Sequence, residues 1–240
     1  TWDELKDVAA KCTQDNVYGL GFCSVQNEEG TFNFMPWVWS TGATSFELGS
    51  ENGIRALTLA KDLIEAGSMP KEVINWTQGD VMNQFISGNL AMMVNGPWQV
   101  PTMREQAPEL NWNVALIPMD KQYASVLGGE NFAVIAGGDE DASVEFLKYA
   151  TSAEKVASYT DEFGYIAARS DVADGQFTDD AIMKQFVEQM KYAQPRGPHA
   201  SWPEISDAIS LAFNQVMIGT ETPESAGAAA QAAIDAILAQ

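Results

Sequence analysis

The sequence predicts an α/β fold. Short apolar runs typical of buried strands alternate with longer segments whose apolar residues recur at helical spacing, and glycine or proline separates many of these segments. The chain has 240 residues, of which 46% are hydrophobic. It is therefore long enough to enclose one or two hydrophobic cores.

The first half of the chain opens with a predicted helix over residues 1–12. Thr1 and Glu4 form a capping-box pattern, and the apolar residues that follow fall on one face. Natural chains usually begin with a few loose residues, so a capped helix at residue 1 predicts that the sequence was cut from a longer chain. Further helices are expected at 50–66 and 81–86, ended by Gly67 and Gly88, and strands at 17–24, 90–94 and 114–117.

The second half of the chain opens with Gly128-Gly129 and a predicted buried strand at 131–136. Helices are expected at 139–151 and 152–163, the latter ended by Gly164, and a long helix is expected from Thr178. Ser201 and Glu204 suggest a second capping box. Thr222-Pro223 predicts the start of an alanine-rich terminal helix.

The net charge disfavours two kinds of partner. Lys+Arg 13 against Asp+Glu 33 gives a net charge of -20, which repels nucleic acid and anionic membrane surfaces. No apolar run reaches the roughly 20 residues that a membrane helix needs, and the first residues do not form a signal peptide. Cys12 and Cys23 are equally compatible with a disulfide and with two free thiols.

Catalytic signatures are absent from the sequence. It contains neither a phosphate-binding G-x-x-x-x-G-K-[ST] loop nor a G-x-S-x-G nucleophile elbow. His199 is the only histidine, which excludes a zinc site built on several imidazoles, and we assign it no catalytic role. The acidic residues leave a glycosidase pair open, although no spacing singles one out. No cofactor is expected.

The tryptophans are the most informative candidates for ligand binding. Trp98 follows Asn95-Gly96-Pro97 at the end of an apolar strand, where ligands gather in open α/β sheets. Trp37 and Trp39 alternate with Val38, so in an extended chain they would share one side. Indole rings suit the C–H faces of sugars. Burial in the core is the alternative for all three residues.

Two further groups could contribute to a ligand site. Gly129, Glu130 and Asn131 precede the predicted strand at 131–136 and offer backbone N–H groups, acceptors and donors to hydroxyl groups. An ordinary turn is the alternative. Trp202 precedes Pro203 at a helix start, where it either covers a ligand or packs against the helix as a hydrophobic staple.

Taken in order, several segments resemble the sugar-binding branch of the extracellular solute-binding proteins, the maltose-binding-protein-like family 1 of ATP-driven (ABC) importers. Phe85-Ile-Ser-Gly-Asn-Leu-Ala-Met-Met-Val-Asn-Gly-Pro-Trp98 is the most specific segment. The others are Thr1-Trp-Asp-Glu-Leu, Pro36-Trp-Val-Trp-Ser-Thr-Gly42, Gly128-Gly-Glu-Asn-Phe-Ala-Val-Ile135, Phe163-Gly-Tyr-Ile-Ala-Ala-Arg169 and Thr222-Pro-Glu.

The resemblance implies a type II periplasmic-binding-protein-like fold, two α/β lobes joined by a hinge, with the N-terminal lobe largely missing. Residues 1–126 and 176–240 would form the C-terminal lobe, and residues 127–175 would be an excursion into the other lobe. Trp98, Trp37 and Trp39 would line one wall of the cleft, and Gly129, Glu130 and Asn131 the other.

The function implied by the resemblance is non-catalytic binding of a sugar or oligosaccharide for delivery to an ABC transporter permease. The full-length protein would be a monomer located outside the cytoplasm, in the periplasm or as a cell-surface lipoprotein. A glycoside hydrolase and a sugar-sensing binding module are the alternatives. Turnover of reporter glycosides would identify the first, and identification of the membrane partner would identify the second.

Overall fold

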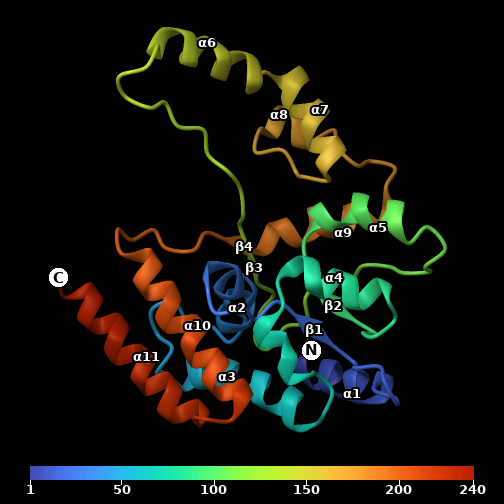
Figure 1. Cartoon of the computed structure of the whole chain (residues 1–240), viewed down its shortest axis with the longest axis vertical. Helices are drawn as coiled ribbons and strands as arrows, with labels where there is room; N and C mark the ends of the chain where they lie inside the picture. Colours follow the sequence, from blue (N-terminus) through green and yellow to red (C-terminus); the bar gives the residue numbers. More distant parts are fainter. The chain divides into compact units, whose positions relative to one another are not determined.

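The computed structural model describes residues 1–240 and divides them into two compact units (Figure 1). Unit 1 comprises residues 1–95, 116–127 and 189–240, and unit 2 comprises residues 96–115 and 128–188. The lobe boundaries that the resemblance implies, with an excursion at 127–175, stay a prediction. Residues 96–115 and 176–188 also belong to unit 2, whereas the sequence had grouped them with the larger part of the chain.

Unit 1 is a helical unit with two short parallel strand pairs. Its elements are α1 (Trp2–Cys12), β1 (Gly21–Phe22), α2 (Glu28–Ser40), α3 (Glu51–Glu65), the 3₁₀ helix Lys71–Asn75, α4 (Gln78–Ile86), β2 (Met93–Val94), β3 (Ser125–Val126), the 3₁₀ helix Met190–Tyr192, β4 (Ala193–Gln194), α10 (Trp202–Ile218) and α11 (Pro223–Leu238).

Unit 2 is smaller, and its regular secondary structure is helical. Its elements are the 3₁₀ helix Pro97–Gln99, α5 (Val100–Gln106), α6 (Glu140–Ala150), α7 (Ala153–Phe163), α8 (Ser170–Ala173) and α9 (Ala181–Gln189), whose last residue belongs to unit 1. No helix of the chain is both long and apolar enough to cross a bilayer.

Local capping signals position most of the helices. The Thr1–Glu4 capping box at the start of α1 is confirmed, and Thr222 caps α11 with Pro223 in its first turn. The predicted helices that become α3, α4, α6 and α7 are also confirmed. Gly164 ends α7 at a φ of 68°, a left-handed conformation that glycine adopts without a steric penalty.

The aromatic segment at 32–39 is a helix, so the prediction of an extended chain was wrong. Asn27 starts α2 because its side-chain oxygen accepts the backbone N–H groups of Glu29 (2.8 Å) and Gly30 (3.3 Å). Two glutamates in the first turn add a favourable interaction with the helix dipole. The strand preference of the aromatic residues is overridden because the helix buries almost all of them.

The core of unit 1 forms around α2, which contacts α3 and α10 (Figure 1). Phe34 is fully buried, and its ring stacks on Phe213 of α10 with centroids 4.1 Å apart. Phe22 of β1 contacts both Phe34 and Trp37. Each such side chain contributes about 1.5–3 kcal/mol by leaving water, so the helix is held by packing on most of its circumference.

The two strand pairs connect segments that are far apart in the sequence. Parallel β1 and β2 pair Gly21 with Met93, which confirms a strand at the end of the 90–94 run. Parallel β3 and β4 pair Ser125 with Ala193, so the chain is hydrogen-bonded to itself on either side of residues 128–188. Both cysteines are free, and Cys23 is fully buried.

Four local predictions were wrong. Residues 114–117 and 131–136 form no strand, and residues 131–136 are exposed rather than buried, because no neighbouring segment pairs with them. The helix expected from Thr178 begins at Ala181, where Asp180 accepts the first backbone N–H groups. Ser201 precedes α10 but makes no side-chain capping bond, because its backbone (φ -96°, ψ 34°) lacks the extended conformation of a cap residue. Its backbone N–H donates to His199 Nδ1 at 3.1 Å.

Candidate functional site

One carboxylate in unit 1 collects donors from a distant part of the chain. Glu28 lies in the first turn of α2, and its Oε1 accepts Arg196 Nε at 2.6 Å. Trp202 Nε1 donates to both carboxylate oxygens at 3.0 Å. The buried hydroxyl of Ser206 donates to Oε2. These bonds connect the start of α2 to the segment that leads into α10.

The guanidinium group of Arg196 also covers an aromatic ring. Its Cζ atom lies 4.6 Å from the ring centroid of Phe32, which follows Glu28 by one helical turn on α2. A third contact runs from Arg196 Nη1 to the carbonyl oxygen of Leu127 at 3.3 Å. The side chain of Arg196 is only 21% exposed, so its charge depends more on the pairing with Glu28 than that of a fully exposed arginine would.

Trp202 begins α10 and is half-buried against the core of unit 1. The six-membered ring of its indole also lies close to Gly197, where a Cβ would come within 3.5 Å of it. We call Glu28, Phe32, Arg196, Trp202 and Ser206 the Glu28 site. It combines two aromatic rings with a satisfied carboxylate and a guanidinium group, the set of groups that binds the faces and hydroxyls of neutral polar ligands.

The Glu28 site is not arranged for hydrolysis. Glycoside cleavage requires two carboxyl groups that face one bond, one of them able to give up a proton. The Glu28 site has one carboxylate, and three donor groups already occupy its oxygens. No group of three or more histidine, cysteine, aspartate or glutamate residues is placed to hold a metal ion.

The tryptophans predicted from the sequence as ligand-binding residues lie in different environments. Trp37 and Trp39 lie inside α2 with 2% and 3% of their surface exposed, and Trp39 Nε1 donates to Ser45 Oγ at 3.1 Å. They are core residues, because side chains with this burial present no face to a ligand. Of the predicted tryptophans in unit 1, only Trp202 is part of the Glu28 site.

The remaining predicted residues belong to unit 2. Trp98 lies in the 3₁₀ helix Pro97–Gln99 and is half-buried, with its indole directly over Gly96. A Cβ at Gly96 would come within 2.1 Å of the ring, so a side chain there would displace the indole. Gly129, Glu130 and Asn131 lie in an exposed segment without regular secondary structure.

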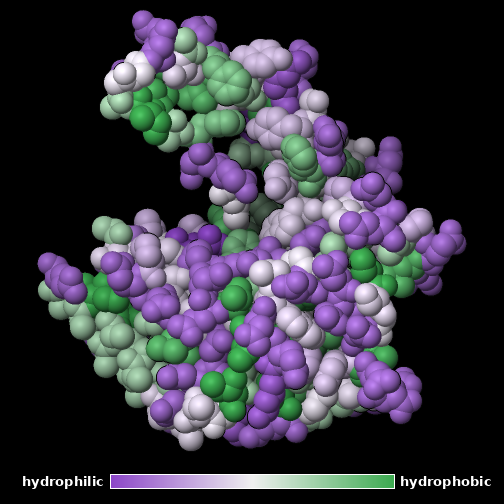
Figure 2. Space-filling model, viewed as in Figure 1, coloured by the Kyte–Doolittle hydropathy of each residue, from purple (hydrophilic) through white to green (hydrophobic).

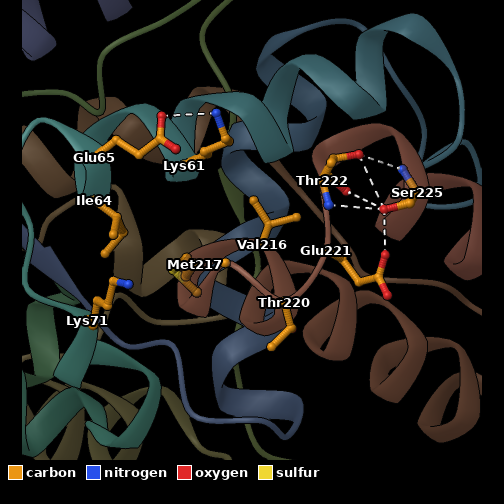
Figure 3. A pocket seen from close by; sticks show the side chains of 11 residues that line it. Lys61, Ile64, Glu65, Lys71, Val216, Met217, Thr220, Glu221, Thr222 and Ser225 are labelled. Atoms are coloured by element: carbon orange, nitrogen blue, oxygen red, sulfur yellow. Dashed lines mark hydrogen bonds and ion pairs between the residues drawn. The ribbon is translucent and has the colours of Figure 1, made fainter.

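A pocket of about 540 Å³ elsewhere in unit 1 has a different character (Figure 3). The turn between α10 and α11 and the end of α3 form it, and its lining contains no aromatic residue. Lys61 and Glu65 form an ion pair at 2.9 Å, while Ser225 bonds to Glu221 at 2.6 Å. These polar groups already satisfy one another, so we assign no ligand to this pocket.

Sequence reasoning missed Glu28, Phe32, Arg196 and Ser206. One signal was present: Asn27 followed by two glutamates marks a helix start, and a helix from residue 28 places Glu28 and Phe32 on the same face. Nothing local indicates that Arg196 or Ser206 meets Glu28, because more than 160 residues separate them from it: the separation is 168 for Arg196 and 178 for Ser206.

Comparison with known proteins identifies the family. Residues 1–185 match the family of bacterial extracellular solute-binding proteins. The chain belongs to this family. Putative binding proteins of Brucella abortus are 26% identical over 249 residues and align with 99% of this chain and 60% of their own length. The maltotriose-binding protein of Pyrococcus abyssi is 28% identical over 52% of this chain and 30% of its own length.

Solved structures of solute-binding proteins share the fold. An ABC transporter solute-binding protein of Thermotoga lettingae, bound with alpha-D-tagatose, has a TM-score of 0.90 and 27% identity and matches 99% of this chain. The GacH receptor of Streptomyces glaucescens, solved unliganded and with acarbose, has a TM-score of 0.81 and 27% identity over 97% of this chain. The solute-binding chain described here spans 64% and 62% of those two chains.

Proposed function

We propose that the full-length protein containing this solute-binding chain captures a sugar or oligosaccharide outside the cytoplasm and delivers it to an ABC transporter permease. The ligand would bind, without covalent chemistry, in a cleft between two lobes that close around it. Family membership supports solute binding, and the relatives from Thermotoga lettingae and Streptomyces glaucescens, each 27% identical, support a carbohydrate ligand.

The Glu28 site is the observation that carries the proposal within this chain. Its half-buried Trp202 is held by the bond from Nε1 to Glu28, with the Phe32–Arg196 stack beside the same carboxylate. A sugar ring can pack its C–H face on an indole while its hydroxyls bond to polar neighbours. We propose Trp202 as a ligand-stacking residue, with Trp98 as a second and Gly129, Glu130 and Asn131 as polar contacts.

Calorimetry on the full-length protein tests this function. Maltose, maltotriose, tagatose and acarbose are suitable first ligands, after a thermal-shift screen in which a tight ligand raises the melting temperature. Replacing Trp202 or Trp98 with alanine is expected to weaken binding by about 1–3 kcal/mol, through lost stacking and burial.

Trp112→Ala is the matched control, since Trp112 is a half-buried tryptophan to which we assign no ligand role. Unchanged affinity in Trp202→Ala and Trp98→Ala, or equal losses in all three variants, would contradict the stacking roles. Reporter glycosides complete the test. Their turnover would show an enzyme and contradict a pure binding function, whereas saturable binding without turnover supports it.

A further inference from the structure

Glu28 is the one residue that contacts every other polar member of the Glu28 site. Its carboxylate accepts from Arg196, Trp202 and Ser206, which lie 168, 174 and 178 positions further along the chain. Because its oxygens are engaged by these three donors, the carboxylate is poorly placed to bond a ligand hydroxyl directly. Its effect on a ligand therefore passes through the side chains that it holds.

The bond to Trp202 fixes the orientation of the indole. Tryptophan has a single hydrogen-bond donor, Nε1–H, and here that group is shared between the two oxygens of Glu28 at 3.0 Å. Trp202 stands at the first position of α10 and is half-buried, so packing restrains it less than it restrains a core tryptophan such as Trp37. Rotation of the indole would break the bond to Glu28.

The bond to Arg196 fixes the second aromatic surface. Arg196 Nε lies 2.6 Å from Glu28, while its guanidinium group rests on the Phe32 ring at 4.6 Å. Without Glu28, the guanidinium group retains the single hydrogen bond to the Leu127 carbonyl at 3.3 Å and carries an uncompensated charge. The carboxylate therefore holds Trp202 directly, and it also holds Arg196, whose guanidinium group covers the Phe32 ring.

We propose that Glu28 is the positioning residue of the sugar site, which sets the Trp202 indole and the Arg196–Phe32 stack in the geometry that the ligand meets. This inference rests on the proposed function. It predicts that loss of Glu28 weakens sugar binding through Trp202, and that the orientation of Trp202 changes even when no sugar is present.

The first experiment requires no ligand. In the full-length protein labelled with ¹⁵N, the Trp202 indole N–H resonance is assigned from its loss in Trp202→Phe. Glu28→Ala is expected to shift this resonance and to speed its exchange with solvent, because the N–H loses its acceptor. Glu29→Ala is the matched control: Glu29 lies next in the same helical turn and bonds to the backbone of Gln78 at 2.7 Å. An unchanged Trp202 resonance in Glu28→Ala overturns the inference.

The second experiment is a double-mutant cycle read by sugar affinity. Glu28→Ala is expected to weaken binding about tenfold in the wild-type background. In a Trp202→Phe background, which has no indole N–H to hold, the same substitution is expected to cost clearly less. Additive effects of the two substitutions would overturn the inference, since Glu28 would then act independently of Trp202.

The two experiments separate the inference from the function on which it rests. If the wild-type protein binds none of the sugars tested, the proposed function fails, and the resonance of Trp202 still decides whether Glu28 positions the indole. If the wild-type protein binds sugar and Glu28→Gln, which retains one acceptor oxygen, recovers part of the lost affinity at an unchanged melting temperature, the positioning role is supported.

Discussion

Two apolar stretches of this chain end in opposite environments. In α2, Phe34, Trp37 and Trp39 are between 0% and 3% exposed. In residues 128–150, Phe132 is 57% exposed and Ile135 is 79% exposed. Apolar side chains gather on the surface of that region, around α6 (Figure 2). Apolar composition alone therefore does not determine burial; the presence of a partner segment does.

The partners of the two stretches explain the difference. Helix α2 contacts α3 and α10, and its first turn is bonded to the segment before α10 through Glu28. Residues 128–138 make no backbone hydrogen bond to another segment, so an apolar extended stretch remains without a sheet to join. Unit 1 supplies its own partners, whereas unit 2 leaves a surface that favours association.

The largest predicted effect compares two phenylalanines. Phe34→Ala in α2 is expected to lower the free energy of unfolding by about 3–5 kcal/mol, because it leaves a cavity beside Phe213. Phe146→Ala in α6 removes the same atoms from a side chain that is 59% exposed and is expected to change stability by no more than about 0.5 kcal/mol. Urea unfolding followed by circular dichroism measures both. Similar losses in the two variants would show that residues 128–150 are packed in solution.

An intermediate effect is expected at the start of α9, which tests whether unit 2 has internal order. Asp180 pairs with Arg104 at 2.8 Å and accepts the backbone N–H groups of Ile182 and Met183 at 3.1 Å. The Arg104 hydrogen bond and then the two backbone N–H groups hold the pKa of Asp180 below its ordinary value. Asp180→Asn is expected to cost about 1 kcal/mol through loss of the charged cap.

The pH dependence of this effect follows from the lowered pKa. The stabilisation by Asp180 is fully present above the ordinary aspartate pKa of about 3.9 and is lost as the pH falls through the lower pKa of the folded state. The difference in stability between wild type and Asp180→Asn should therefore shrink on acidification below about pH 4. Asp179→Asn, an exposed neighbour, is the control. A difference that grew on acidification would contradict the assigned role of Asp180.

The smallest effect on stability is expected at Ile135. Ile135→Ser should change the free energy of unfolding by no more than about 0.5 kcal/mol, because the side chain is exposed. It should nevertheless reduce concentration-dependent association of the 240-residue chain, as measured by size exclusion with light scattering. Val8→Ser, at a position that is 42% exposed on α1, should leave association unchanged. A wild-type chain that remains monomeric at all concentrations would contradict this prediction.

The same comparison explains which elements the sequence could predict. The starts of α1 and α11 depend on side chains within three residues of the cap, so Thr1 with Glu4 and Thr222 with Pro223 were sufficient. Helix α2 was not predicted. Asn27 marks its start, but the aromatic residues that follow have strand propensity, and the α10 contacts that bury them lie far along the chain. The strand predicted at 131–136 depends on a partner that the local sequence does not contain.

The candidate site could be predicted only in part. Trp202 was singled out because a tryptophan before a proline at a helix start is a local pattern. Its acceptor Glu28 lies 174 residues earlier, and only the folded chain brings the two together. Trp37 and Trp39 were selected because indole rings suit sugar faces. They point to different sides of α2, and both are buried because packing surrounds the helix.

The parallel pair β3–β4 has a consequence for how this chain tolerates change. Val126 pairs with Gln194, and Leu127 N–H donates to the Gln194 carbonyl at 2.8 Å, immediately before residue 128 leaves unit 1. Residues 128–188 are thus inserted into unit 1, and the unit 1 segments on either side of them are hydrogen-bonded to each other. Evolution can lengthen, shorten or exchange such an insertion while the core of unit 1 and the β3–β4 pairing stay unchanged. Variation in the length of residues 132–138, which follow the proposed ligand contacts at 129–131, should accordingly be readily accepted.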